Sequence, residues 1–201
     1  TFAGIQVDGS ICAESIDASK SRTCYVSGLV GYVDKFGDTG FAYTVVTACD
    51  LDLDVQLRSA GGSMSYSGIT DVTTDWAGQV YYTNVTGSVE AYGDGITIKL
   101  LDNCEYCTCS QNMDLTATGT IKAVGSKFGI GNAVSGIYTV TGASADAGVD
   151  LYALEFCDDS CFYGSMTATG TAGFVALLGA SLGDWVQVEC PMTVHMPDTE
   201  V

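Results

Sequence analysis

Apolar and polar residues alternate along much of this chain. At residues 50–57, aspartate or glutamine alternates strictly with leucine or valine. Successive side chains of a β-strand point to opposite faces, so this pattern predicts a strand with one buried and one polar face. Similar apolar stretches predict further strands at residues 79–85, 96–100, 137–140, 150–156 and 185–188. No long segment has a helical period.

Glycine-containing turn signals separate these predicted strands. They include Gly61-Gly62, Tyr92–Gly95 and Ala147-Gly148, and they recur roughly every 8–12 residues, as in sandwiches and barrels. We therefore expect a single all-β domain over residues 1–201. The expected fold is an antiparallel β-sandwich or barrel with little or no helix.

A degenerate internal repeat organises the chain. Four segments end in a Ser/Thr-Gly pair, at residues 24–28, 64–68, 115–119 and 166–170, and each is followed by a cysteine near the end of an apolar stretch. The pattern predicts four units at about residues 22–49, 62–104, 113–157 and 164–190. Residues 191–201 are expected to form an extended C-terminal tail.

Nine cysteines in 201 residues are typical of an exported, disulfide-bonded protein. The densest group is Cys104-x2-Cys107-x-Cys109, and Cys157-x3-Cys161 lies at the matching point of the next unit. We interpret them as disulfides that staple the repeats, while a thiolate metal site at Cys104, Cys107 and Cys109 stays open as an alternative. The disulfide candidates are Cys12, Cys24, Cys49, Cys104, Cys107, Cys109, Cys157, Cys161 and Cys190. Because nine is odd, at least one cysteine has no partner within the chain.

The charge excludes two classes of partner. The chain carries 24 acidic and 7 basic residues, a formal net charge of -17. Phosphate backbones and anionic membrane surfaces would be repelled, so we expect no nucleic acid and no membrane partner. The apolar run at residues 172–182 is too short to span a bilayer. The amino terminus resembles a processed, mature chain, which together with the cysteines predicts an extracellular or cell-surface location.

Asp50, Asp52 and Asp54 form a candidate calcium site. They share a strand face at a spacing of about 6.5–7 Å. Ca²⁺ needs several oxygens around it, so neighbouring loops would have to complete the shell. A solvated sheet face is the alternative interpretation, and no other cofactor is predicted.

Catalytic signals are few. The sequence has a single histidine, His195, and it lies in the predicted tail without a nucleophile-elbow motif for a partner. No glycine-rich phosphate loop opens a helix. We therefore predict that the protein is not an enzyme, with a secreted hydrolase as the least favoured alternative.

Two features indicate possible ligand surfaces. Trp76 and Trp185 each follow an aspartate, an arrangement suited to stacking on sugar rings, although core packing is the usual role of tryptophan. The Thr-Ala-Thr-Gly-Thr segments at residues 116–120 and 167–171 resemble the Thr-x-Thr ladders of ice-binding surfaces. Two short copies alone predict no regular array.

The sequence thus favours an extracellular structural protein, a subunit of a filament, pilus or surface layer that self-associates into a homo-oligomer or polymer. Residues 1–7 could join a neighbouring sheet by strand addition. The alternative is an extracellular carbohydrate- or ligand-binding module with a glycan partner.

Overall fold

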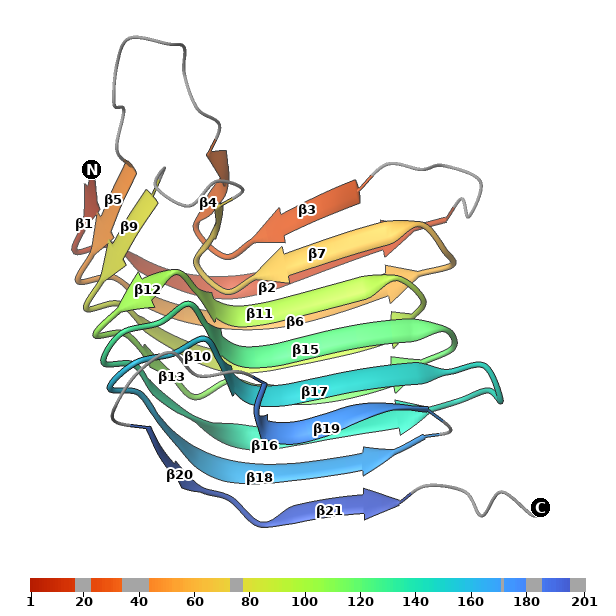
Figure 1. Ribbon diagram of the computed structural model, residues 1–201. Helices are drawn as coiled ribbons and strands as arrows, with labels where there is room; N and C mark the ends of the chain where they lie inside the picture. The colour runs from red at the N-terminus through yellow and green to blue at the C-terminus, as the bar shows by residue number, and fades with distance from the viewer. Residues whose placement is uncertain (17–22, 34–43, 73–77, 171, 180–185, 196–201) are drawn as a thin grey trace, which may run out of the picture.

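The chain winds into a parallel β-solenoid. The computed structural model describes residues 1–16, 23–33, 44–72, 78–170, 172–179 and 186–195. Within these residues the chain crosses from one sheet to the next in each coil, and each coil stacks on the previous one (Figure 1). Every strand pairing among the described residues is parallel, and none of them forms a helix.

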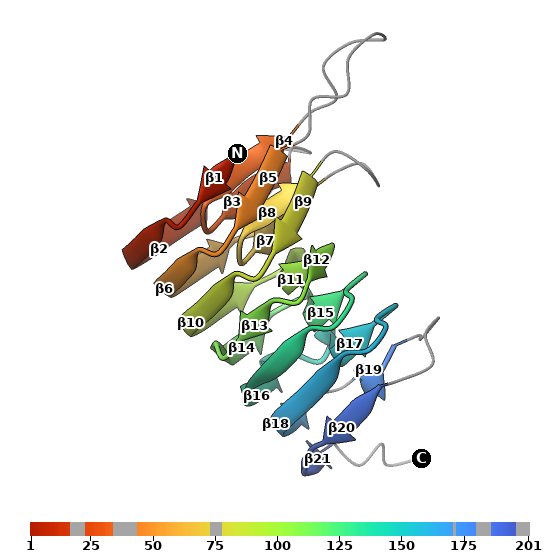
Figure 2. The ribbon, with the colours of Figure 1, turned by 90° about the vertical axis from the view of Figure 1, so that its left-hand side faces the viewer.

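The first sheet runs the whole length of the stack, with its strands side by side in chain order (Figure 2). Its strands are β2 (Gln6–Ser15), β6 (Asp50–Ser59), β10 (Asn84–Gly93), β13 (Thr108–Cys109), β14 (Asn112–Ala117), β16 (Ala133–Gly142), β18 (Cys161–Thr169), β20 (Gln187–Glu189) and β21 (Met192–His195).

Three further sheets complete the coils. The second sheet contains β3 (Thr23–Ser27), β7 (Ser63–Ser67), β11 (Ile96–Asp102), β15 (Thr120–Lys127), β17 (Gly148–Glu155) and β19 (Ala172–Leu178). The third contains β1 (Phe2–Ala3), β5 (Thr44–Thr47), β9 (Gly78–Tyr81) and β12 (Cys104–Glu105), and a small fourth sheet pairs β4 (Val30–Val33) with β8 (Thr70–Val72).

The coil is the structural repeat. In the first sheet Asn84 pairs with Asp50, Thr108 with Asn84, Ala133 with Thr108 and Cys161 with Ala133. Equivalent positions are therefore 34, 24, 25 and 28 residues apart. Because the spacing varies, a fixed period does not describe the sequence.

Three columns of inward-facing side chains form the core beneath the first sheet. Each column takes one residue from every coil, and its central members are almost completely buried. The columns are Val7-Leu51-Val85-Cys109-Val134-Phe162-Val188, Ile11-Val55-Val89-Met113-Tyr138-Met166-Met192 and Ala13-Leu57-Ala91-Leu115-Val140-Ala168-Val194. Stacking apolar residues on one another excludes water from the interior along the whole stack and fixes the register of the coils.

A buried polar ladder marks the corner that leads into the first sheet. We call Cys49, Thr83, Cys107, Asn132 and Ser160 the corner ladder, because each backbone N–H donates to the side chain of the next member, at 2.9–3.5 Å. The residue before each member has a positive φ, between 47° and 64°. The left-handed residue turns the chain, and the side chain from the following coil satisfies the N–H that the turn leaves unpaired.

The prediction of an antiparallel sandwich or barrel is wrong. Turns such as Gly61-Gly62 carry the chain from the first sheet to the second instead of reversing it within one sheet, so each strand pairs with its equivalent in the next coil. The rest of the coil supplies the long crossover that parallel pairing requires. Of the four Ser/Thr-Gly segments, those at residues 24–28 and 64–68 stack in the second sheet, whereas those at residues 115–119 and 166–170 belong to the first.

The predicted disulfide staples are also wrong, because the structure holds no disulfide bond between these cysteines. Cys49 and Cys107 are members of the corner ladder, and Cys109 occupies an inner column. Cys157 donates from inside the stack to the backbone oxygen of Ser126 at 3.2 Å. The buried cysteines act here as small apolar residues with weak hydrogen-bonding capacity.

Candidate functional site: the outer face of the first sheet

The outer face of the first sheet has two chemically different halves. We call the outward residues of β2, β6 and β10 the acidic half, because they include Asp8, Asp50, Asp52, Asp54 and Glu90. Six threonines on β14, β16, β18 and β21 form the threonine array, namely Thr116, Thr139, Thr141, Thr167, Thr169 and Thr193.

In the acidic half, the structure places Asp50, Asp52 and Asp54 on one exposed strand face, as the alternation predicts. Hydroxyls of the neighbouring strand engage two of these carboxylates: Thr86 Oγ1 donates to Asp52 at 2.9 Å and Ser88 Oγ donates to Asp54 at 2.7 Å. The described residues hold no group of three or more His, Cys, Asp or Glu side chains that could bind a metal ion. The calcium site therefore stays a prediction from the sequence.

The threonine array consists of two columns that follow the stack. Thr139, Thr167 and Thr193 pair in one column, and Thr116, Thr141 and Thr169 pair in the other. They alternate along their strands with buried residues such as Val140 and Ala168, which turns the threonines outward. The array is thus a small two-dimensional lattice of hydroxyl and methyl groups.

A shallow hollow of about 170 Å³ lies where the two halves meet. Its lining includes Arg58, Glu90, Tyr92, Asp114 and Thr116. Glu90 pairs with Asp114 across adjacent strands, and the ring of Tyr92 is 55% exposed. The hollow offers a mixed polar surface rather than an enclosed pocket.

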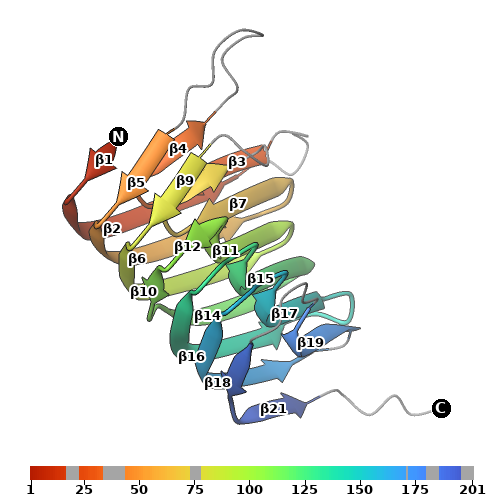
Figure 3. The same ribbon diagram turned by 60° about the vertical axis from the view of Figure 1, so that its left-hand side comes forward.

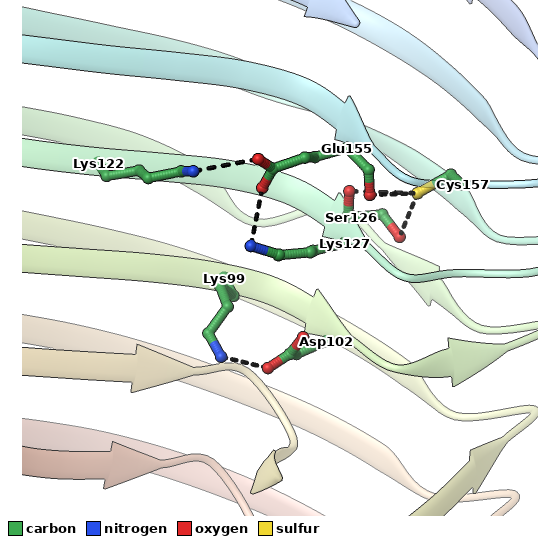
Figure 4. Close-up of polar contacts among 7 residues, drawn as sticks. All are labelled: Lys99, Asp102, Lys122, Ser126, Lys127, Glu155 and Cys157. Atoms are coloured by element: carbon green, nitrogen blue, oxygen red, sulfur yellow. Dashed lines mark hydrogen bonds and ion pairs between the residues drawn. The ribbon is translucent and has the colours of Figure 1, made fainter. Parts of the chain in front are cut away.

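The second sheet carries a network of ion pairs on its outer side (Figure 4). Lys122 Nζ and Lys127 Nζ each lie 3.1 Å from a carboxylate oxygen of Glu155, and Lys99 pairs with Asp102. Asp102, Lys127 and Glu155 are register partners, so opposite charges alternate along the stack.

These contacts set the pKa of Glu155. Burial of the carboxyl acts to raise its pKa, but hydrogen bonds from Lys122 and Lys127 and the charges of both lysines outweigh that effect, so the pKa is lowered. Glu155 therefore stays ionised at neutral pH and ties two adjacent coils together, through β15 and β17.

Several buried cysteines resist ionisation. Burial raises the pKa of Cys109 to about 12 and also raises the pKa of Cys157. Since the thiolate is the form that attacks electrophiles or binds metals, these two thiols are structural at neutral pH.

The two ends of the stack lie far apart, with β1 and β2 at one end and β21 at the other (Figure 3). Among the described strands, β2 pairs only with β6, and β20 and β21 pair only with β18. The inward residues of these end coils are only partly buried, as Val7, Ile11 and Val188 show. Both ends thus combine an unpaired backbone edge with incompletely covered apolar residues.

Other residues singled out from the sequence lie at the end of the first sheet or outside the described structure. Trp76 and Trp185 fall outside the described residues. The backbone of His195 belongs to β21, where it pairs with Thr169. No helix in the described part of the chain is long and apolar enough to cross a membrane.

Sequence reasoning missed both the extent of the threonine array and the hollow at Tyr92. The signal for the array was the spacing Thr-x-Thr, which occurs at residues 116–118, 139–141 and 167–169. Its significance depends on register, since Thr139 and Thr141 stack on Thr167 and Thr169. The residues around Tyr92 come from successive coils and share no local motif.

Comparison with known protein families, with curated proteins and with solved structures finds no match for this chain.

Proposed function

We propose that the protein is an extracellular structural subunit that associates end to end into a filament. The observation that carries this proposal is the pair of unpaired edges at opposite ends of one parallel stack. A parallel edge at one end is complementary to the opposite edge of another copy, and such head-to-tail contacts that do not close a ring build open filaments.

The inner columns support the same geometry. A second copy stacked in register would place its Val7 against Val188, its Ile11 against Met192 and its Ala13 against Val194, because these are the terminal members of the three columns. Each partly exposed end residue would then gain the neighbour that every central coil already has. Terminal coils of solenoid proteins need such covering for solubility.

This mechanism differs from the strand addition expected for residues 1–7. Phe2–Ala3 pair with Val46–Thr47 of β5, and Val7 pairs with Leu51 of β6 within the same chain. The amino-terminal segment is therefore the first coil of the stack and presents its free edge to a neighbour.

A proline at the free edge of β2 tests the proposal. Asp50 N donates to Ile5 O and Ala60 N to Ser15 O, so the odd-numbered residues of β2 bond to β6 and the N–H of Ser10 points away from it. Ser10→Pro therefore blocks pairing with a second copy and removes no bond to β6, as tolerated for edge strands.

Electron microscopy and light scattering over a concentration series supply the readout. We expect filaments from the wild type and from the control Ser10→Thr, and monomers from Ser10→Pro with an unchanged circular dichroism spectrum. A wild-type protein that stays monomeric at high concentration, or a Ser10→Pro variant that still polymerises, would overturn the proposal.

A further inference from the structure

The threonine array lies on the side of the stack and takes no part in the proposed end-to-end association. Its six side chains come from four consecutive strands of the first sheet, and the pairings of β14 with β16, β16 with β18 and β18 with β21 keep one register. Along a strand, alternate residues are about 6.6–6.8 Å apart, and neighbouring strands are about 4.7–4.9 Å apart. The hydroxyls therefore repeat in two dimensions on a rigid support.

The hydroxyls of the array are free to bind water. In the acidic half, the hydroxyls of Thr86 and Ser88 donate to Asp52 and Asp54, and on neighbouring β13 the hydroxyl of Thr108 donates to Asn84. Among the described residues, none of the six hydroxyls of the threonine array has a hydrogen-bond partner within the protein. Water must satisfy them, and the lattice of the strands dictates where that water sits.

Charge also separates the two halves. The chain carries a formal charge of -17, yet the six positions of the array bear none, and their acidic register partner Asp114, opposite Thr139, lies at the margin of the array. A neutral surface on a strongly acidic protein suits a neutral partner, since carboxylates would orient water around themselves instead of in a lattice. Apart from the shallow hollow beside Thr116 at its edge, the described part of the array is an open face, unlike the concave sites for small ligands.

We propose that the threonine array binds ice. The hydroxyls hold water molecules in a two-dimensional repeat close to that of oxygen atoms on the prism faces of hexagonal ice, and the methyl groups between them restrict where those waters settle. The ordered layer then joins the lattice of a growing crystal. The alternative occupant, a crystalline neutral polysaccharide, presents hydroxyls at a similar scale and is an outcome of the test.

The test compares one substitution at two places on the same sheet. Thr167→Lys puts a long charged side chain in the middle of the array, and the matched control Thr86→Lys does the same in the acidic half. Thr167→Val, which removes only the hydroxyl, is the gentle second variant should the lysine disturb the fold. The readouts are thermal hysteresis, the shape of single ice crystals and partition into a growing ice hemisphere.

We expect the wild type and Thr86→Lys to show hysteresis, faceted crystals and enrichment in ice. Thr167→Lys should lose the hysteresis, and Thr167→Val should lose part of it. A wild type excluded from ice, equal activity of Thr167→Lys, or equal loss in Thr86→Lys would each overturn the proposal. Binding to crystalline cellulose or chitin without hysteresis would overturn it in favour of a polysaccharide.

Discussion

The outer faces of the first and second sheets cover the same core but use their polar groups differently. On the second sheet, Lys99, Lys122 and Lys127 each pair with a carboxylate of the same face. On the first sheet, the described carboxylates accept hydrogen bonds from hydroxyls or an amide, and the hydroxyls of the threonine array have no partner among the described protein groups. On the second sheet the polar groups pair with one another and stabilise the fold. On the first sheet they remain available to partners.

The largest expected effect comes from a substitution in the corner ladder, because both faces depend on it. Asn132 is buried; its Oδ1 accepts from Cys107 N, and its Nδ2 donates to Cys104 O and Ser126 Oγ, at 2.9–3.1 Å. Asn132→Ala leaves the N–H of Cys107 buried without its partner and removes one of the two hydrogen bonds to Cys104 O, which also accepts from Ile130 N. The loss should cost roughly 2–4 kcal/mol.

Urea unfolding measures this loss, and Asn84→Ala is the control. Asn84 lies on the outer face of the first sheet and accepts from Thr108 at 2.6 Å, so its loss should change stability by about 0.5 kcal/mol or less. Equal midpoints for Asn132→Ala and wild type would show that the ladder does not hold the corner.

A smaller effect is expected for Glu155→Gln on the second sheet, about 1–2 kcal/mol, because two charged hydrogen bonds are weakened. The lowered pKa of Glu155 gives the effect a pH dependence. The carboxylate stabilises the fold above its unfolded-state pKa, about 4.3, and the contribution disappears as the pH falls through the lower folded-state pKa. The gap in Tm between variant and wild type should therefore close in acid.

Thermal unfolding between neutral pH and pH 3 tests this, with Glu90→Gln on the first sheet as the matched control. Glu90 is exposed and accepts one long hydrogen bond, 3.5 Å from Gln56 Nε2, so we expect little change at any pH. If the two variants behave alike, the two faces do not differ as described.

The smallest effect is expected from removing single hydroxyls on the first sheet. Thr86→Ala and Ser88→Ala each delete one exposed hydrogen bond to an aspartate. Water replaces such a bond, so the free energy of unfolding should change by no more than about 0.5 kcal/mol. A decrease in the free energy of unfolding of more than about 1 kcal/mol, measured by chemical denaturation, would show that this face also stabilises the fold.

Several individual strands could be predicted from the sequence, but their pairing could not, and the strand predicted at residues 79–85 spans the corner between β9 and β10. The alternation at residues 50–57 lies within β6, and the apolar stretches at 96–100 and 150–156 identify β11 and most of β17. Alternation usually indicates an antiparallel sheet, because parallel sheets are commonly buried on both faces. A solenoid leaves the outer face of each parallel sheet in water, so its strands show the same pattern.

The candidate surface was hidden by variable coil length. Thr141-Gly142 stacks on Thr169-Gly170, but a comparison by Ser/Thr-Gly pairs aligned residues 115–119 with 24–28, which lie in different sheets. Register is a property of the stacked backbone, and the sequence shows only the residues that occupy it. The cysteine content led to the wrong disulfide prediction for a related reason. The residues next to a cysteine in the sequence do not show that it is buried in the corner ladder or in an inner column.

The corner ladder also gives the molecule a direction. Each N–H is satisfied by the coil that follows it in sequence, and the positions before and after the ladder are the aliphatic residues Ile5 and Val186. While the chain is being synthesised, the newest coil therefore holds an unsatisfied donor until the next one leaves the ribosome.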